Sequence, residues 1–132
     1  MAGSVLIIDD DQGVLDTIRL VLAREGYDVL TASDGKSAIE LMSRRDCSAK
    51  VCTVLCDLEM PDMGGKELID YFRKNFPDIP IIIISGASDT VFLDGIVQQG
   101  VCDWIRKPVN RETLLDKVRK GSNLYSLRRQ CR

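Results

Sequence analysis

The feature that most constrains the fold is an apolar run that ends in one carboxylate and a turn-rich loop. Residues 51–56 read Val-Cys-Thr-Val-Leu-Cys without a charge, and Asp57 follows directly. A strand this apolar along its whole length is typical of a parallel sheet that helices cover on both faces. Pro61, Gly64 and Gly65 then predict a break before the next element. A carboxylate at the end of such a strand lies where open α/β sheets bind ligands, although it can also simply cap the next turn.

The same alternation of strand and helix patterns runs along the whole chain. The predicted strands are residues 5–8, 27–32, 51–56, 81–84 and 101–105. Apolar residues at helical spacing fall within 14–22, 38–42, 66–75, 88–99 and 114–118. Strands too apolar to be half exposed, alternating with helices, predict an α/β fold: one doubly wound domain of five strand–helix units.

Local signals predict where several of these helices begin and end. Asp11 and Asn110 are placed to cap the first and last helices, and Gly26 to end the first. The polar stretch 44–46 is expected to be a linker. Gly121 and the serine after it are expected to interrupt the last helix, because both are poorer helix formers than the residues before them.

Composition excludes several classes of protein. At 132 residues, the chain is long enough for one domain with a single core. It has no histidine, no C-x-x-C pair and five cysteines, at positions 47, 52, 56, 102 and 131. Zinc sites and histidine-dependent nucleophiles are therefore not expected, and the cysteines are interpreted as small buried hydrophobes in a reducing compartment. No signal peptide or membrane-spanning run is recognised, which predicts a cytoplasmic location.

Charge divides the chain into two unequal parts. Residues 1–116 hold 12 basic and 20 acidic side chains, whereas residues 117–132 hold six basic and none acidic. The acidic body is not expected to bind nucleic acid. The basic end is a separate feature that charge alone does not explain.

Chemistry-bearing side chains stand at four predicted strand ends. Asp9 and Asp10 follow the first strand, Asp57 the third, Ser85 the fourth and Lys107 the fifth. In a parallel sheet these ends share one edge, so the side chains are expected to converge. Carboxylates suit Mg²⁺, and a lysine and a hydroxyl can contact a phosphoryl group. The pattern indicates phosphoryl chemistry with a carboxylate as nucleophile.

Four motifs in this order resemble the receiver domain of two-component response regulators. They are Leu6–Asp11, Asp57–Pro61 with Gly65, Ile82–Gly86 and Trp104–Pro108. The resemblance spans about residues 4–120 and implies a flavodoxin-like parallel sheet in the order 2-1-3-4-5. Residues 121–132 are then interpreted as a basic C-terminal extension: a linker to an effector domain outside this chain, a helical dimer seam, or a frayed end.

The resemblance also implies roles for individual residues. Asp57 would be the phosphoacceptor, and Asp10 and Asp57 direct ligands of Mg²⁺ or Mn²⁺. Asp9 would bind the metal directly or through water, and the backbone carbonyl of Glu59 would be a further ligand. Ser85 would be the family's hydroxyl switch. Lys107 would contact the phosphoryl group, with a cis peptide before the following proline.

Two residues depart from the commonest pattern of the family. Trp104 stands where a smaller aromatic switch residue is usual, and is either a switch or a plain packing residue. The side chain of Glu59 adds a negative charge near the site, and the sequence does not decide whether it affects the chemistry or projects into solvent.

The expected function is a phosphorylation-controlled switch that is not itself an enzyme. Its expected partners are a sensor histidine kinase or a histidine phosphotransfer protein, and a second copy bound through the fourth helix, fifth strand and fifth helix. Three alternatives remain. A hydrolase could use Asp57 as nucleophile, although position 59 is not the usual second aspartate. A flavodoxin-like nucleotide binder lacks its glycine-rich motifs, and an interaction module without phosphorylation would not need the acids.

Overall fold

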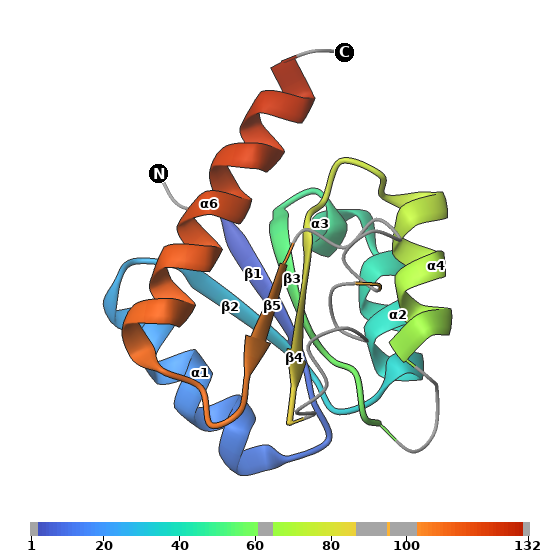
Figure 1. The fold of residues 1–132 in the computed structure, drawn as a ribbon. Coiled ribbons are helices and arrows are strands. Elements are labelled where there is room, and N and C mark those ends of the chain that lie inside the picture. Colours follow the sequence, from blue (N-terminus) through green and yellow to red (C-terminus); the bar gives the residue numbers. More distant parts are fainter. Residues whose placement is uncertain (1–2, 61–64, 87–94, 96–102, 131–132) are drawn as a thin grey trace.

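Five parallel strands form one sheet at the centre of the molecule (Figure 1). The computed structural model of the chain describes residues 3–60, 65–86, 95 and 103–130. The strands are β1 (Ser4–Ile8), β2 (Asp28–Ala32), β3 (Val51–Asp57), β4 (Ile81–Ser85) and β5 (Asp103–Arg106). Their order is β2-β1-β3-β4-β5, and each neighbouring pair is parallel. The predicted sheet order is confirmed, and each predicted strand lies within two residues of its observed bounds where the structure describes it.

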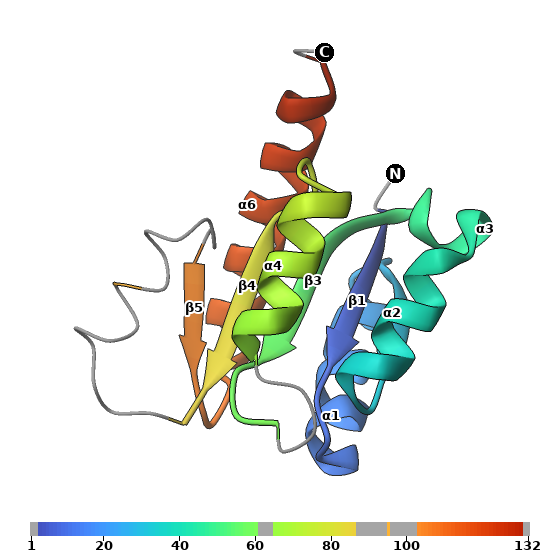
Figure 2. The same cartoon turned by 90° about the vertical axis from the view of Figure 1, so that its right-hand side faces the viewer.

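Helices cover both faces of the sheet (Figures 1 and 2). One face carries α1 (Gln12–Arg24) and α6 (Arg111–Gln130), and the other carries α2 (Gly35–Ser43) and α4 (Gly65–Asn75). The helix predicted within residues 88–99 falls outside the described residues. Within the described part of the chain, none of the helices combines the length and apolarity that crossing a bilayer requires.

The predicted helix ends are confirmed by their hydrogen bonds. Asp11 Oδ1 accepts from the backbone N–H of Gly13 at 2.9 Å and of Val14 at 3.3 Å, so it caps α1. Asn110 Oδ1 accepts from the N–H of Thr113 at 3.1 Å at the start of α6. Gly26 follows α1 with φ of +88°, a left-handed conformation that glycine adopts without steric cost.

A short helix replaces the linker expected at residues 44–46. The helix α3 (Arg45–Ser48) begins there, and the backbone N–H groups of Ser48 and Ala49 donate to the carbonyls of Arg44 and Arg45 at 2.9 and 3.0 Å. The linker prediction was wrong because it relied on polarity alone. The segment between α2 and β3 contains no glycine or proline, so nothing in it opposes a helical turn.

The core consists of two apolar layers, one on each side of the sheet. The layer under α2 and α4 includes Met42, Leu68 and Phe72, and the layer under α1 and α6 includes Ile18 and Leu114. The three central strands are buried along their whole length, as predicted. The edge strands β2 and β5 are partly exposed, so the expectation of full cover fails there, because an edge strand has a neighbour on one side only.

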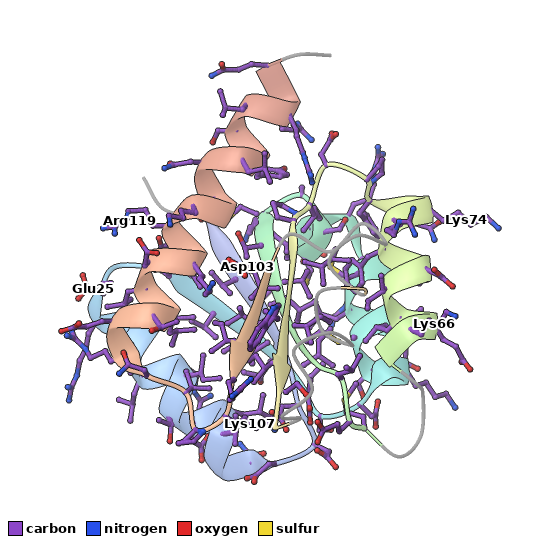
Figure 3. The ribbon with its side chains drawn as sticks, in the orientation of Figure 1. Glu25, Lys66, Lys74, Asp103, Lys107 and Arg119 are labelled. Atoms are coloured by element: carbon purple, nitrogen blue, oxygen red, sulfur yellow. The ribbon has the colours of Figure 1, made fainter. Side chains whose placement is uncertain are left out.

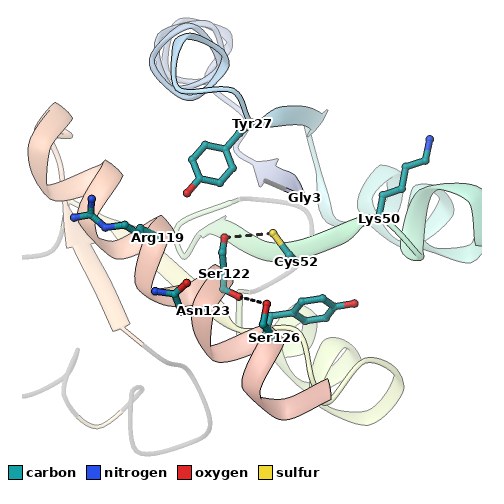
Figure 4. Close-up of a pocket in the computed structure, with 9 residues that line it drawn as sticks. Gly3, Tyr27, Lys50, Cys52, Arg119, Ser122, Asn123 and Ser126 are labelled. Atoms are coloured by element: carbon teal, nitrogen blue, oxygen red, sulfur yellow. Dashed lines mark hydrogen bonds between the residues drawn. The ribbon is translucent and has the colours of Figure 1, made fainter. Parts of the chain in front are cut away.

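The last helix continues without a break through Gly121, contrary to the prediction. Helix α6 runs to Gln130, and its end projects past the edge of the sheet where the strands begin (Figures 1 and 2). Gly121 is buried, and a Cβ placed on it would lie 3.1 Å from both Thr53 Cγ2 and Thr53 Oγ1. One residue on, Ser122 Oγ lies 3.4 Å from Cys52 Sγ (Figure 4). Close packing on β3 therefore outweighs the low helix propensity of glycine.

This contact predicts that the effect of a methyl group at position 121 depends on Thr53. In the parent chain, Gly121→Ala should be neutral or destabilising, since the helix-propensity gain of about 1 kcal/mol meets crowding against Thr53. In a Thr53→Ala background the crowding atoms are gone, so Gly121→Ala should stabilise by about 0.5–1 kcal/mol.

Urea denaturation of the parent, Gly121→Ala, Thr53→Ala and the double variant gives the effect of the added methyl group on stability with and without the Thr53 side chain. Gly121→Val should cost about 1–3 kcal/mol in the parent, whereas Asn123→Val, on the exposed side of α6, should stay within about 0.5 kcal/mol. Equal effects of Gly121→Ala in the two backgrounds would show that the approach to Thr53 does not limit this position.

Candidate functional site

Four strand ends bring the predicted site residues together at one edge of the sheet. Asp9 follows β1, Asp57 ends β3 and Ser85 ends β4. Lys107 follows β5 (Figure 3). Asp9, Asp57 and Ser85 are buried, with 0%, 2% and 0% of their surface exposed, whereas Asp10 is exposed. Buried carboxylates are rare unless an opposite charge compensates them, so this edge of the sheet is the candidate functional site.

The ammonium group of Lys107 lies between two buried carboxylates. Its Nζ is 3.3 Å from Asp9 Oδ2 and 3.5 Å from Asp57 Oδ2. The peptide between Lys107 and Pro108 is cis, as the family resemblance implies. Burial opposes the lysine's charge, but the carboxylates of Asp57 and Asp9 outweigh it and raise the pKa of Lys107. The lysine therefore supplies a positive charge at this edge.

Asp57 is held at both carboxylate oxygens. Its Oδ1 accepts a hydrogen bond from the backbone N–H of Glu59 at 3.1 Å, while Oδ2 faces Lys107. Burial raises the pKa of Asp57, and the nearby charge of Asp9 raises it further, whereas the N–H of Glu59 and the charge of Lys107 lower it. The net direction is upward, so the charge of Lys107 does not fully offset the effect of burial on Asp57.

The acidic group also fits a divalent cation. One carboxylate oxygen from each of Asp9, Asp10 and Asp57 lies within 4.8 Å of the others. Two oxygens bound to one Mg²⁺ are at most about 4.2 Å apart, so the group can bind directly after a small movement or through a bridging water. Asp9 Oδ2 is buried and makes no hydrogen bond within the described residues, although it faces the Lys107 ammonium. The oxygen-only ligand set suits Mg²⁺ or Mn²⁺.

We expect Asp10→Asn to weaken Mg²⁺ binding by about tenfold or more, equivalent to about 1.4 kcal/mol. The change removes one of three clustered charges, so the metal-free protein should be equally stable or more stable, by up to about 1 kcal/mol. Thermal unfolding at a series of Mg²⁺ concentrations measures both effects.

Asp11→Asn is the matched control, because it is the same substitution at the next position. Asp11 caps α1 and is not a member of the acidic group. Asparagine caps helices as well as aspartate does, so neither stability nor Mg²⁺ affinity should change. Unchanged Mg²⁺ affinity in the Asp10 variant would contradict the proposed ligand set.

Ser85 contacts a partner that the sequence did not identify. Its hydroxyl donates to Oε1 of Glu59 at 2.7 Å. The question left open for the Glu59 side chain therefore has an answer: it turns towards Ser85, although the residue as a whole is exposed. Its position two residues after Asp57 was the available signal. The role of its backbone carbonyl as a metal ligand stays a prediction.

Trp104 lies at the margin of the site, on edge strand β5. It is half-buried and packs against the core layer under α2 and α4. The guanidinium carbon of Arg106 lies 5.4 Å from the centre of its ring, a cation–π distance. These contacts account for its packing role, and its role as a switch stays a prediction.

The cysteines take no part in the site's chemistry within the described residues. Cys52 and Cys56 are buried and Cys47 is partly buried, all as free thiols. Burial, with the charges of Asp57 and Asp9, raises the pKa of Cys56 to about 12, so it stays a neutral thiol. The predicted role as small hydrophobes holds for Cys52 and Cys56; positions 102 and 131 lie outside the described residues.

A hollow of about 440 Å³ opens beside the site. It lies between the first turns of α1 and the loop after β5, where Val14, Ile18 and Val109 line it together with Lys107. The edge of the sheet that carries Asp57 is thus not sealed on this side.

The chain is similar in sequence to curated proteins over most of its length. The chain is similar to the transcriptional regulatory protein GlrR of Escherichia coli, with 33% identity over 114 residues, covering 86% of this chain and 25% of that protein. It is also 33% identical over 117 residues to the autoinducer sensor kinase/phosphatase CqsS of Vibrio cholerae, covering 86% of this chain and 16% of that one. The chain thus spans a quarter or less of these two curated relatives.

The fold matches solved structures as well. A response regulator receiver domain protein from Clostridium thermocellum superposes with a TM-score of 0.87 at 26% identity, covering 96% of this chain and 98% of that one. Residues 5–119 match the family described as the response regulator receiver domain. Over that range, the chain belongs to the response regulator receiver domain family.

Proposed function

We propose that the chain is a phosphorylation-controlled switch that accepts a phosphoryl group on Asp57. The observation that carries the proposal is the contact of Lys107 with both buried acids, 3.3 Å from Asp9 Oδ2 and 3.5 Å from Asp57 Oδ2. A carboxylate held beside an ammonium group and open to a hard cation is suited to attack phosphorus.

In the proposed reaction, a carboxylate oxygen of Asp57 forms a bond to phosphorus while the bond from phosphorus to the donor atom breaks. The donor atom leaves with the electron pair of that bond. Lys107 offsets the negative charge of the transferred group, and the Ser85 hydroxyl donates a hydrogen bond to one of its oxygens. When bound, Mg²⁺ would offset further charge at Asp9, Asp10 and Asp57.

The proposed donor is a histidine kinase or a histidine phosphotransfer protein. The family assignment supports such a donor and favours the switch over the hydrolase and nucleotide-binding alternatives. We further propose that the chain's own phosphorylation and dephosphorylation are its only reactions. Asp57 is buried and its carboxylate lies beside the Lys107 ammonium, which supports a phosphoacceptor over an interaction module without phosphorylation.

The proposed output runs through β5, α6 and the helix predicted within residues 88–99, towards an effector or a second copy. Relatives that place this domain in a transcriptional regulator and in a sensor kinase support an output that differs from protein to protein. The unbroken helix α6, which projects past the sheet, supports a linker over a frayed end.

Incubation with acetyl phosphate tests the proposed function. The chain should gain one phosphoryl group in the presence of Mg²⁺ and none in the presence of EDTA, and peptide mass mapping should place the group on Asp57. Modification that is equally fast in EDTA, or that maps to another residue, would contradict the proposal.

A further inference from the structure

Glu59 contacts two functional residues at once. Its backbone N–H donates to Asp57 Oδ1 at 3.1 Å, and its carboxylate accepts from the Ser85 hydroxyl at 2.7 Å. The acceptor in the second bond is a carboxylate, and a hydrogen bond to a charged acceptor is about twice as strong as one between neutral groups. The residue after β3 thus reaches across to the end of β4.

The hydrogen bond between Ser85 and Glu59 competes with the chemistry proposed for the site. A serine hydroxyl has one proton to donate. While Ser85 donates to Glu59, it cannot donate to an oxygen of a phosphoryl group on Asp57. The serine must therefore exchange one acceptor for another when the group arrives.

Ser85 and Glu59 differ in burial, so the loss of their hydrogen bond has different costs for the two side chains. Ser85 is fully buried, whereas Glu59 is exposed, so water can solvate the carboxylate as soon as the serine leaves it. A buried hydroxyl without an acceptor would cost far more than a solvated carboxylate. The contact is hence one that forms in the resting chain and is released when a better acceptor is offered.

We propose that Glu59 is a positioning residue that holds Ser85 in the resting state and so weakens the binding of a phosphoryl group at Asp57. The inference rests on the proposed function of Asp57 and adds a regulatory element to it. Glu59 acts through the Ser85 hydroxyl, and direct repulsion between its charge and the phosphoryl group is the competing explanation.

A double-mutant cycle separates the two explanations. Beryllofluoride, which imitates a phosphoryl group, is titrated by calorimetry at saturating Mg²⁺ into the parent chain and three variants: Glu59→Ala, Ser85→Ala and the double variant. We expect Glu59→Ala to tighten beryllofluoride binding about tenfold in the parent, equivalent to about 1.4 kcal/mol. In the Ser85→Ala background, where no hydroxyl is held, the same change should have less than about a twofold effect.

Glu40→Ala is the control for the loss of one negative charge, since Glu40 is exposed on α2, away from the site. It should leave the affinity unchanged, and thermal unfolding should show that all variants fold. An equal gain from Glu59→Ala in both backgrounds would assign the effect to charge repulsion and overturn the inference, and so would no gain in the parent.

The same titrations distinguish a failure of the proposed function of Asp57 from a failure of the role proposed for Glu59. If the parent chain binds no beryllofluoride with Mg²⁺ present, both the function of Asp57 and the inference are overturned. If the parent binds it and the Ser85-dependent gain is missing, only the role of Glu59 is overturned.

Discussion

Asp57→Asn should reduce phosphorylation by acetyl phosphate to background. In the parent chain, the N–H of Glu59 donates to Asp57 Oδ1 at 3.1 Å. The amide has nearly the shape of the carboxylate, so this N–H can still donate to the side-chain oxygen of Asn at position 57. What the variant loses is the anionic oxygen that attacks phosphorus. Intact-mass measurements after incubation with Mg²⁺ and acetyl phosphate give the modified fraction.

The fold of this variant should not suffer. Asp57 is buried with a raised pKa, which means that its charge is disfavoured where it stands. Removing that charge should leave the metal-free protein equally stable or more stable. Asp11→Asn, the same substitution at the α1 cap, should be phosphorylated like the parent. Parent-like phosphorylation of the Asp57 variant would show that another residue is the acceptor.

The second large effect is expected at the lysine between the acids. Lys107→Met keeps most of the aliphatic chain but removes the cation from Asp9 and Asp57, and leaves both buried carboxylates without it. Breaking a fully buried ion pair costs about 3–5 kcal/mol, and partial exposure of the lysine reduces this to about 1–3 kcal/mol here. At about 4 °C per kcal/mol, the melting temperature in EDTA should fall by about 4–12 °C.

Magnesium should reverse much of this loss. A bound divalent cation places positive charge next to the same carboxylates, so the stabilisation by Mg²⁺ should be larger in Lys107→Met than in the parent. Thermal unfolding in EDTA and in saturating Mg²⁺ compares the two proteins. Equal stabilisation of both would mean that the lysine and the metal do not act on the same charges.

Lys117→Met provides a matched control for this experiment. The side chains of Lys117 and Lys107 are similarly exposed, at 24% and 27%, and Lys117 also pairs with an aspartate, Asp103, at 2.6 Å. Asp103 is 40% exposed, however, so this pair should be worth no more than about 1 kcal/mol. Its loss should not depend on Mg²⁺.

Features set by local chemistry could be predicted from the sequence. The central strands follow from uninterrupted apolar runs, and the caps at Asp11 and Asn110 follow from short-range hydrogen bonds. The convergence of Asp9, Asp57 and Lys107 follows from the geometry of parallel strands, because the ends of such strands lie on one edge.

Features that depend on contacts between distant elements could not be predicted. Helix propensity predicted a break at Gly121, but contact with Thr53 in β3 decides that position. The direction of the Glu59 side chain depends on where Ser85 stands at the end of another strand. Neither pair has a signal in the spacing of the residues, since each is defined only once the sheet has formed.

The close packing at Gly121 has a consequence for whatever adjoins α6. Because an α-helix turns about 100° and rises about 1.5 Å with each residue, a contact that fixes one residue against β3 also fixes the direction of every later one. Tyr125, one turn on, faces the same side and packs against the core, whereas Leu127 points outward and is 58% exposed. One residue inserted after Gly121 would rotate the following part of the helix by about 100°, and about seven would be needed to restore its direction. Gly121 therefore defines the angle at which any continuation of α6 leaves the domain.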